Sequence, residues 1–242
     1  FITTNQKFIW PLVMNNDKTG ILISAGLFYP SKLGGPANTL YWLSKSLVSN
    51  NIRVSVVTSN NHIDDELVEF DKWTEIDNIR VRYCTVNSKL SCRVIFHSVK
   101  ELFKSNVILL SSIFYIPSFF IALFAALTSK KIIWSPRGEL FNSAINGSKP
   151  KLLYVKLVKL LFSKRVVFHA TSTIEKREIN KHFGNSVRTI VIPNYIVLHE
   201  KMDRLEKAGK YFLYVGRIAP IKALDNLLLG LAKSDAFMKS DY

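Results

Sequence analysis

The fold is indicated by residues 21–58, ILISAGLFYPSKLGGPANTLYWLSKSLVSNNIRVSVVT. Residues 21–25 form a compact apolar run, and residues 54–58 form a second run of mostly β-branched residues. Continuous runs of this kind are typical of strands that are buried on both faces of a parallel sheet. Between them, leucines recur at helical spacing from Leu40, after a loop rich in turn residues. The stretch therefore predicts a strand, a helix and a second, parallel strand.

The same alternation continues as far as residue 192. Further strands are predicted at residues 80–83, 107–110, 132–134, 166–170 and 189–192, and helices at 94–103, from 119, at 152–162 and at 173–183. Strands that alternate with helices in this way predict an α/β fold with an open parallel sheet and helices on both faces. Residues 64–77, with seven acidic residues and one lysine, are expected to form a solvated loop.

The alternation stops near residue 195, which divides the chain into four parts. We predict an N-terminal extension at 1–19, a first domain at 20–195, a polar linker at 196–210 and the first strand and helix of a second domain at 211–242. One strand and one helix bury too little apolar surface to form a domain alone. We therefore interpret the chain as truncated. Residues 1–13 carry no signal-peptide pattern, and Met14, which precedes a short polar stretch and the first strand, is interpreted as the initiator.

Composition excludes several protein classes. With 48% hydrophobic residues among 242, the chain is neither disordered nor collagen-like. The two cysteines, Cys84 and Cys92, form no metal spacing with the scattered histidines and are predicted to be structural thiols of a cytoplasmic protein. Residues 105–129 carry no charge, but serines and a proline interrupt them, so they are predicted to form a strand, a loop and a buried helix rather than a membrane span.

Charge is concentrated in residues 79–165, which contain 15 basic and two acidic residues and hold +13 of the net +15. Within them, residues 149–165 interleave lysines with leucine, valine and aromatic residues. Such a helix either binds the anionic inner face of a cytoplasmic membrane or covers a core with a solvated basic edge, and both readings stay open. No nucleic-acid partner is predicted, because RNP, zinc-finger and homeodomain patterns are absent from the sequence.

Two loops that follow predicted strands contain candidate site residues. Gly34 and Gly35 precede Pro36 at the start of a helix, where exposed N–H groups and the helix dipole favour a phosphate, although the same residues also simply make a turn. Arg137 and Glu139 follow the strand ending at residue 134, at the sheet edge where ligands bind in open α/β folds. The alternative for this pair is a turn with an exposed ion pair.

Three further features lie later in the chain. Ser172 and Glu175 fit a capping box, in which Ser172 accepts from the N3 N–H and Glu175 reaches back to the Ser172 N–H. Asn194 follows a strand with Pro193 and is predicted to form the turn out of the sheet, although it faces the same sheet edge as Arg137. Arg217 and Lys222, at the strand-to-helix junction of the second domain, are spaced to clamp a diphosphate.

Taken in order, these segments resemble the retaining GT-B glycosyltransferases of glycosyltransferase family 4, also described as glycosyl transferases group 1. The family contains bacterial mannosyl- and glucosyltransferases of lipopolysaccharide, capsule and exopolysaccharide assembly. The resemblance extends from about residue 21 to residue 232. The segments that carry it are GGPANTLYWLSKSL, VSVVTSN, WSPRGEL, HATSTIEKREINKHFG, VIPNYI and YVGRIAPIKALDNLLLGLAK.

The resemblance implies a two-domain, Rossmann-like hexosyltransferase that binds a nucleotide-sugar donor mainly through its second domain and a saccharide or lipid-linked acceptor through its first. It implies no cofactor and no obligatory metal. Gly34 and Gly35 correspond to the glycine loop near the donor phosphates. Arg217 and Lys222 correspond to the basic pair that neutralises the leaving diphosphate, a role that fixed cations can fill without a metal. Arg137 falls where many relatives carry a histidine near the reacting sugar, so it is the catalytic candidate.

Two departures from the family pattern keep other functions open. Ala223 stands where a glycine usually follows the lysine, and the family's paired glutamates would lie beyond Tyr242. We therefore expect the chain as given to bind donor weakly and to be inactive alone. One alternative is a catalytically incompetent remnant that binds saccharide or membrane, and another is a nucleotide-sugar epimerase of GT-B shape, which needs carboxylates and a histidine for proton chemistry.

Overall fold

The computed structural model describes residues 19–33, 35–88, 90–145, 147–195, 213–216, 218 and 220–238. The chain divides into two compact units, Phe1–Val197 and Leu198–Tyr242. The division falls inside the polar stretch 196–210, which lies outside the described residues, as do the N-terminal residues 1–18 with Met14.

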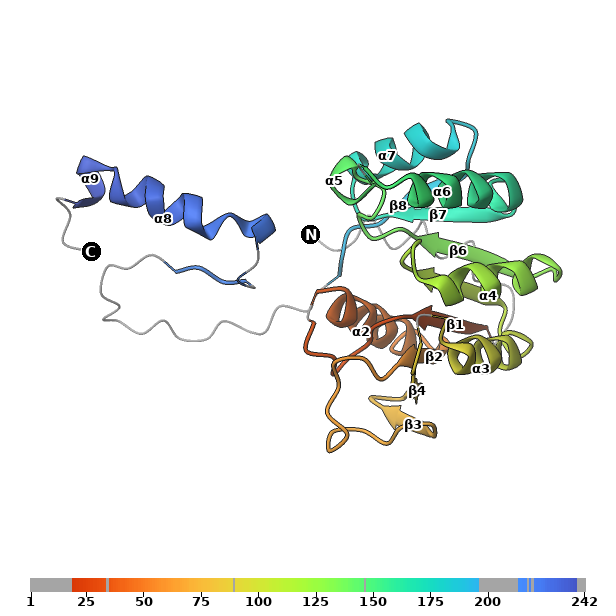
Figure 1. Cartoon of the computed structure of the whole chain (residues 1–242). Coiled ribbons are helices and arrows are strands. Elements are labelled where there is room, and N and C mark those ends of the chain that lie inside the picture. The colour runs from red at the N-terminus through yellow and green to blue at the C-terminus, as the bar shows by residue number, and fades with distance from the viewer. Residues whose placement is uncertain are drawn as a thin grey trace. The chain divides into compact units, whose positions relative to one another are not determined.

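The first unit is built on one eight-stranded sheet in the order β3-β4-β2-β1-β5-β6-β7-β8 (Figure 1). Its strands are β1 Gly20–Ala25, β2 Arg53–Ser59, β3 Trp73–Ile76, β4 Ile79–Cys84, β5 Val107–Ser111, β6 Lys131–Ser135, β7 Val166–Ala170 and β8 Thr189–Val191. Its helices are α2 Gly35–Val48, α3 Cys92–Leu102, α4 Ile116–Ala126, α5 Asn142–Ile145, α6 Lys149–Phe162 and α7 Thr173–Phe183. Neighbouring strands are parallel from β4 to β8, which confirms the predicted α/β class and its open parallel sheet.

Strand β3 corrects the prediction of a solvated loop at 64–77. It pairs antiparallel with β4, with Trp73 opposite Arg82. Asp77 and Asn78 both have positive φ, 51° and 61°, which is the geometry of a two-residue hairpin turn. The strand forms because Trp73 packs against the core and the guanidinium carbon of Arg80 lies 3.9 Å from the centre of its ring, a cation–π contact. The acidic composition of the segment does not indicate this contact.

The two faces of the sheet are covered unequally. One face packs against α3, α4, α6 and α7, and the other packs against α2. Within β5, Ile108 belongs to the first core and Leu109 to the second, because successive side chains of a strand point to opposite faces. Because helices cover both faces of the central strands, these strands are apolar along their whole length rather than at every second residue.

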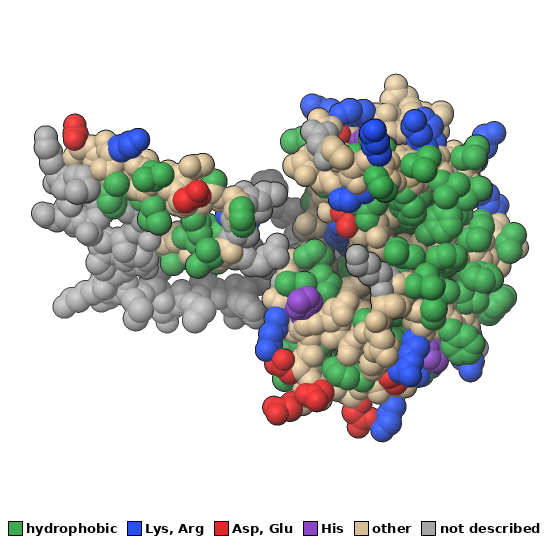
Figure 2. Space-filling view, viewed as in Figure 1, with side chains coloured by type: hydrophobic (Ala, Val, Ile, Leu, Met, Phe, Trp, Pro, Cys, Tyr) green, Lys and Arg blue, Asp and Glu red, His purple; other side chains and the backbone are tan. Residues whose placement is uncertain are grey.

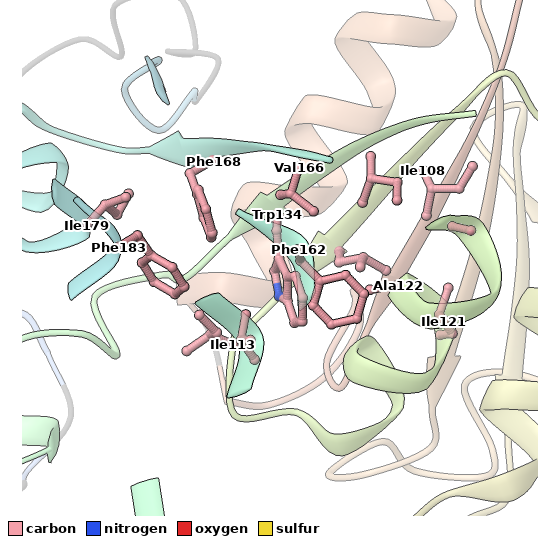
Figure 3. Packing of buried hydrophobic residues seen from close by; sticks show 14 of the residues in the cluster. Ile108, Ile113, Ile121, Ala122, Trp134, Phe162, Val166, Phe168, Ile179 and Phe183 are labelled. Carbon is pink, nitrogen blue, oxygen red and sulfur yellow. The ribbon is translucent and has the colours of Figure 1, made fainter. Parts of the chain in front are cut away.

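The larger core is centred on Trp134 of β6 (Figure 3). Its ring meets that of Phe162 from α6 at a centroid distance of 5.7 Å and an angle of 65°, and Phe162 meets Phe119 of α4 at 5.5 Å and 83°. The indole N–H of Trp134 donates to the carbonyl of Ser112 at 3.0 Å, so the polar group of this buried side chain is paired.

The uncharged segment 105–129 forms β5, a loop and α4, as predicted, although α4 begins at Ile116 rather than at residue 119. Pro117 occupies the first turn, where its missing N–H has no partner to lose. In the described part of the chain, the helices are all too short or too polar to cross a membrane.

The second unit contains a 3₁₀ turn, η1 Pro220–Lys222, and the helices α8 Leu224–Ala232 and α9 Asp235–Met238. Of the strand predicted at 211–215, residues 213–215 are not in a strand, and residues 211 and 212 lie outside the described residues. Ala223 caps α8 in the left-handed conformation, with φ 48°. Glycine adopts this conformation without strain and alanine does not. The backbone at this position therefore favours the glycine that usually follows the lysine in the family that the sequence resembles.

Candidate functional site

The loop after β6 contains the catalytic candidate and has a strained backbone. Arg137 and Gly138 both adopt positive φ, 56° and 78°, directly after the strand ends at Ser135. A non-glycine residue in this region costs about 1 kcal/mol, so the surrounding contacts must fix the loop in place. The Gly138 N–H supplies one such contact by donating to Oε1 of Glu175 at 2.6 Å.

The Arg137 side chain is half-buried, and most of its donors are unused. Its Nη1 donates to Oδ1 of Asn194 at 3.0 Å, whereas Nε and Nη2 are buried without a hydrogen-bond partner. Burial lowers the pKa of Arg137, and the negative charge of Glu175 opposes that shift. A buried guanidinium with unpaired N–H groups is unfavourable until an acceptor completes it, and an anion is the strongest acceptor.

Glu175 positions this loop from the start of α7. Its Oε2 accepts from both the backbone N–H and the hydroxyl of Thr171, at 2.6 and 2.7 Å, while Oε1 takes the Gly138 N–H. The predicted capping box is half confirmed: the Ser172 hydroxyl accepts from the Glu175 N–H at 3.1 Å. The other half is wrong, because the carboxylate binds Thr171 and Gly138 instead of the Ser172 N–H.

Glu139 is also engaged by neighbouring groups. Its carboxylate accepts from the Ser112 hydroxyl at 2.7 and 2.8 Å, from the Ile113 N–H at 2.6 Å and from the Phe114 N–H at 3.1 Å. These contacts join the loop after β6 to the loop after β5. The exposed Arg137–Glu139 ion pair that was the alternative prediction is not among the ion pairs of the described residues, since each side chain binds other partners.

His169, in β7, belongs to the same edge and was missed by the sequence analysis. Its Nε2 lies 2.9 Å from the carbonyl of Ile192 and its Nδ1 lies 3.0 Å from the hydroxyl of Ser135. Since a carbonyl only accepts, Nε2 carries a proton and donates to Ile192, whereas the Ser135 hydroxyl can either donate to Nδ1 or accept from it. Burial lowers the pKa of His169, which favours the neutral imidazole with Nδ1 as the acceptor. A histidine one residue before the end of a predicted strand was the available signal.

Arg137 and His169 border a cavity of about 310 Å³ on the sheet face beside α2. Its end near the carboxyl termini of the strands is lined by Thr39, Arg137, His169, Asn194 and Tyr195. Its opposite end is lined by basic side chains from the amino ends of the strands and the turns before them, Lys130, Lys131, Lys164, Arg165 and Arg188.

The first turn of α2 meets this cavity. The Thr39 hydroxyl donates to the Gly35 carbonyl at 2.8 Å, so the lining residue Thr39 and the helix start are one turn apart. No atom outside the neighbouring residues lies within 4 Å of the position that a Cβ at Gly35 would take. The start of α2 therefore leaves open space for a ligand, at the same edge of the sheet as Arg137.

The structure thus places four of the predicted site residues, Gly35, Arg137, Glu139 and Asn194, at one edge of the sheet, where Arg137 and Asn194 are joined by a hydrogen bond. Lys222 lies in η1 of the second unit and is exposed, while Gly34 and Arg217 lie outside the described residues. Among described side chains, no cluster of three histidine, cysteine or acidic residues is arranged to hold a metal ion. Cys84 is buried and Cys92 exposed, and both are free thiols.

Neither protein-family models nor curated proteins give a match to this chain. Among solved structures, sucrose-phosphate synthase from Thermosynechococcus elongatus is similar, with a TM-score of 0.50 and 10% identity, over 73% of this chain and 48% of that chain. UDP-N-acetylglucosamine 2-epimerase from Rickettsia bellii gives a TM-score of 0.44 and 13% identity, over 92% of this chain and 51% of that one. The chain therefore spans about half the length of these proteins. At this identity the likeness to the synthase concerns the fold, a Rossmann-like α/β domain of the GT-B type.

Proposed function

We propose that the chain is the acceptor-side part of a glycosyltransferase that uses a nucleotide-sugar donor. The supporting observation is the Arg137 guanidinium, which is buried at the carboxyl edge of the sheet with Nε and Nη2 unpaired. In open α/β sheets this edge is where ligands bind, and a fork of N–H donors suits the oxygens of a phosphate or a sugar hydroxyl. The open start of α2 beside it adds backbone N–H groups of the same preference.

The proposed reaction is a retaining transfer without a metal. The bond between C1 of the sugar and the diphosphate breaks, the acceptor hydroxyl forms a new bond to C1 on the same face, and its proton leaves with the departing diphosphate. Lys222 and Arg217 are proposed to neutralise that diphosphate, and Arg137 to contact the sugar during transfer. Fixed cations stabilise developing negative charge without reorganisation, which is why such a site can work without a metal.

The arrangement of proton-transfer groups favours this proposal over an epimerase. An epimerase must remove and return a proton, which needs side chains with free lone pairs or protons. At this edge, the described carboxylates Glu139 and Glu175 each accept hydrogen bonds from neighbouring loops, and both nitrogens of His169 have partners. A transferase places no such demand on these three side chains, since they can serve to hold the loops around Arg137.

The acceptor is proposed to be lipid-linked or to be a growing cell-surface saccharide, as in lipopolysaccharide, capsule or exopolysaccharide assembly. A lipid-linked acceptor requires an enzyme that works at the cytoplasmic face of a membrane. The basic residues of 149–165 supply positive charge for that location. A catalytically incompetent remnant is the second candidate, and it would bind the same ligands without turning them over.

The test is a titration of the full chain with UDP-glucose, GDP-mannose and ADP-glucose, followed by calorimetry. We expect Arg137→Gln to weaken binding of the preferred donor by at least tenfold, because one charge-assisted hydrogen bond is worth about 1.5–3 kcal/mol. Arg188→Gln, which removes a cation from the opposite end of the cavity, is the matched control and is expected to change affinity less than threefold. Equal losses in both variants would contradict a specific role for Arg137.

A further inference from the structure

Helices α4 and α6 present an unusually apolar outer surface. They pack next to each other on the sheet, and Figure 2 shows a continuous hydrophobic area on the side of the first unit that carries them. We call this surface the α4/α6 face. Its exposed apolar side chains are Leu123, Phe124 and Leu127 with Leu152, Leu153, Leu157, Leu160 and Leu161.

These side chains protrude rather than fill gaps. Leu127 and Leu160 are each 80% exposed and Leu153 is 70% exposed. Single exposed leucines are ordinary on protein surfaces, but a contiguous group on two adjacent helices marks a surface that contacts another apolar phase. The buried side of α6, with Val155, Val158 and Phe162, already faces the core, so the exposed leucines are additional to those that folding requires.

The face is also free of carboxylates. Between residues 79 and 165 the chain has only two, Glu101 and Glu139. Glu101 is 3% exposed and binds Arg80 and the Ser55 hydroxyl, and Glu139 is held by the loop after β5. Basic side chains nevertheless stand among the leucines on α6, where Lys156 and Lys159 are exposed.

We infer that the α4/α6 face docks the protein on an anionic lipid bilayer, with its leucines inserted at the boundary between headgroups and acyl chains. Apolar burial and attraction to anionic headgroups are the two terms that hold interfacial helices on membranes. Helices of 11 and 14 residues cannot span the hydrocarbon layer, so an interfacial position is the geometry open to them. Lys156 and Lys159 keep their ammonium groups at the headgroups while their stems lie beside the leucines.

Charge argues against a second copy of the chain as the occupant. A twofold interface places the same patch of each copy against the other. The cations of the α4/α6 face would then meet cations, with no carboxylate on either copy to pair with them. An anionic bilayer offers an apolar phase for the leucines of this face and negative charge for its lysines.

The α4/α6 face meets the sheet edge of the candidate site at the beginnings of its two helices, whereas Leu127 and Leu160 lie near their ends. Helix α4 follows β5 and α6 follows the loop after β6, so both begin at the carboxyl edge of the sheet, where Arg137 lies. The inference names a partner for the proposed function. It rests on that function only for the biological role of docking, because binding to vesicles itself requires neither donor nor acceptor.

The experiment is flotation of the full chain with vesicles of phosphatidylcholine alone and of phosphatidylcholine mixed equally with phosphatidylglycerol. We expect binding to the anionic vesicles and much weaker binding to the neutral ones. Leu153→Gln with Leu160→Gln is expected to lower the partition coefficient about tenfold for each leucine. Lys156→Gln with Lys159→Gln is expected to lower it about fivefold for each lysine. Lys151 is not used, because its ammonium already donates to the Ala144 carbonyl at 2.6 Å.

The matched control is Leu67→Gln with Lys72→Gln, which removes an exposed leucine and an exposed lysine from the opposite edge of the sheet, near β3. It is expected to bind vesicles as the wild type does. Absent binding to anionic vesicles, or equal loss in the control, would overturn the inference. Loss in the lysine variant without loss in the leucine variant would refute insertion. A dimer in sedimentation velocity that Leu160→Gln dissociates would identify a second copy as the occupant instead.

Discussion

Removing the charge of Glu175 tests how the loop that carries Arg137 is held. Glu175 is buried, and its two oxygens accept three hydrogen bonds, one from Gly138 and two from Thr171. In Glu175→Gln only one side-chain oxygen remains, so the amide NH₂ must face either the Gly138 N–H or the two Thr171 donors. Hydrogen bonds to a charged group contribute about 1.5–3 kcal/mol each, and an unpaired buried donor costs about 1–3 kcal/mol. We expect a loss of about 3 kcal/mol in the free energy of unfolding.

The assay is urea unfolding followed by circular dichroism and tryptophan fluorescence, with thermal unfolding in parallel. A loss of about 3 kcal/mol corresponds to a fall in Tm of roughly 6–12 °C for a chain of this size. The control is Glu69→Gln, an exposed carboxylate in a surface ion pair with Lys72, for which we expect a loss below about 0.5 kcal/mol. A Glu175→Gln variant as stable as Glu69→Gln would refute the role of this carboxylate in fixing the loop.

Two other measurements test individual side chains. Burial lowers the pKa of His169 below its ordinary 6.5, so this histidine binds a proton more readily in the unfolded chain than in the folded one. The free energy of unfolding should therefore fall as the pH drops below about 6.5. In His169→Gln that fall should be shallower, and an unchanged slope in urea unfolding at pH 7.5 and 5.5 would contradict the assignment. Burial also raises the pKa of Cys84 to about 11, whereas Cys92 is exposed. A disulfide reagent at pH 8 should therefore titrate one thiol rapidly and the second only in denaturant, and Cys92→Ser should abolish the rapid phase; two rapid thiols would count against the burial of Cys84.

The elements with strong boundaries could be predicted from the sequence. The strand at 166–170 and the helix at 173–183 agree with the structure at both ends, since charged residues precede the strand and a serine cap separates it from the helix. Helix α4 begins three residues earlier than predicted because the uncharged run offers no polar residue to mark its start. Strand β3 was missed because its stabilising partner, Arg80, is visible only once the hairpin is formed.

Part of the candidate site could be predicted, and part required coordinates. Loops that follow strands of a parallel sheet meet at one edge, which is why Arg137 and Asn194 were expected there. Their direct hydrogen bond joins residues 57 positions apart, and spacing along the chain carries no information about such a distance. The same holds for Glu175, whose capping position was predicted from its local pattern and whose contact with Gly138 was not. His169 was missed because a histidine inside an apolar run is also compatible with simple burial.

The central claim is that this chain is part of a glycosyltransferase that uses a nucleotide-sugar donor. Donor recognition tests it most directly, because the chain alone is expected to bind donor weakly and to be inactive. The full chain is incubated with UDP-glucose, GDP-mannose and ADP-glucose in the presence of a metal chelator, and ligand-observed NMR follows both weak binding and any chemical conversion of the ligand. The account predicts weak, saturable binding of one nucleotide sugar, which Arg137→Gln lowers and Arg188→Gln leaves within threefold. Conversion of the nucleotide sugar into its epimer, or no binding of any of the three, would contradict it.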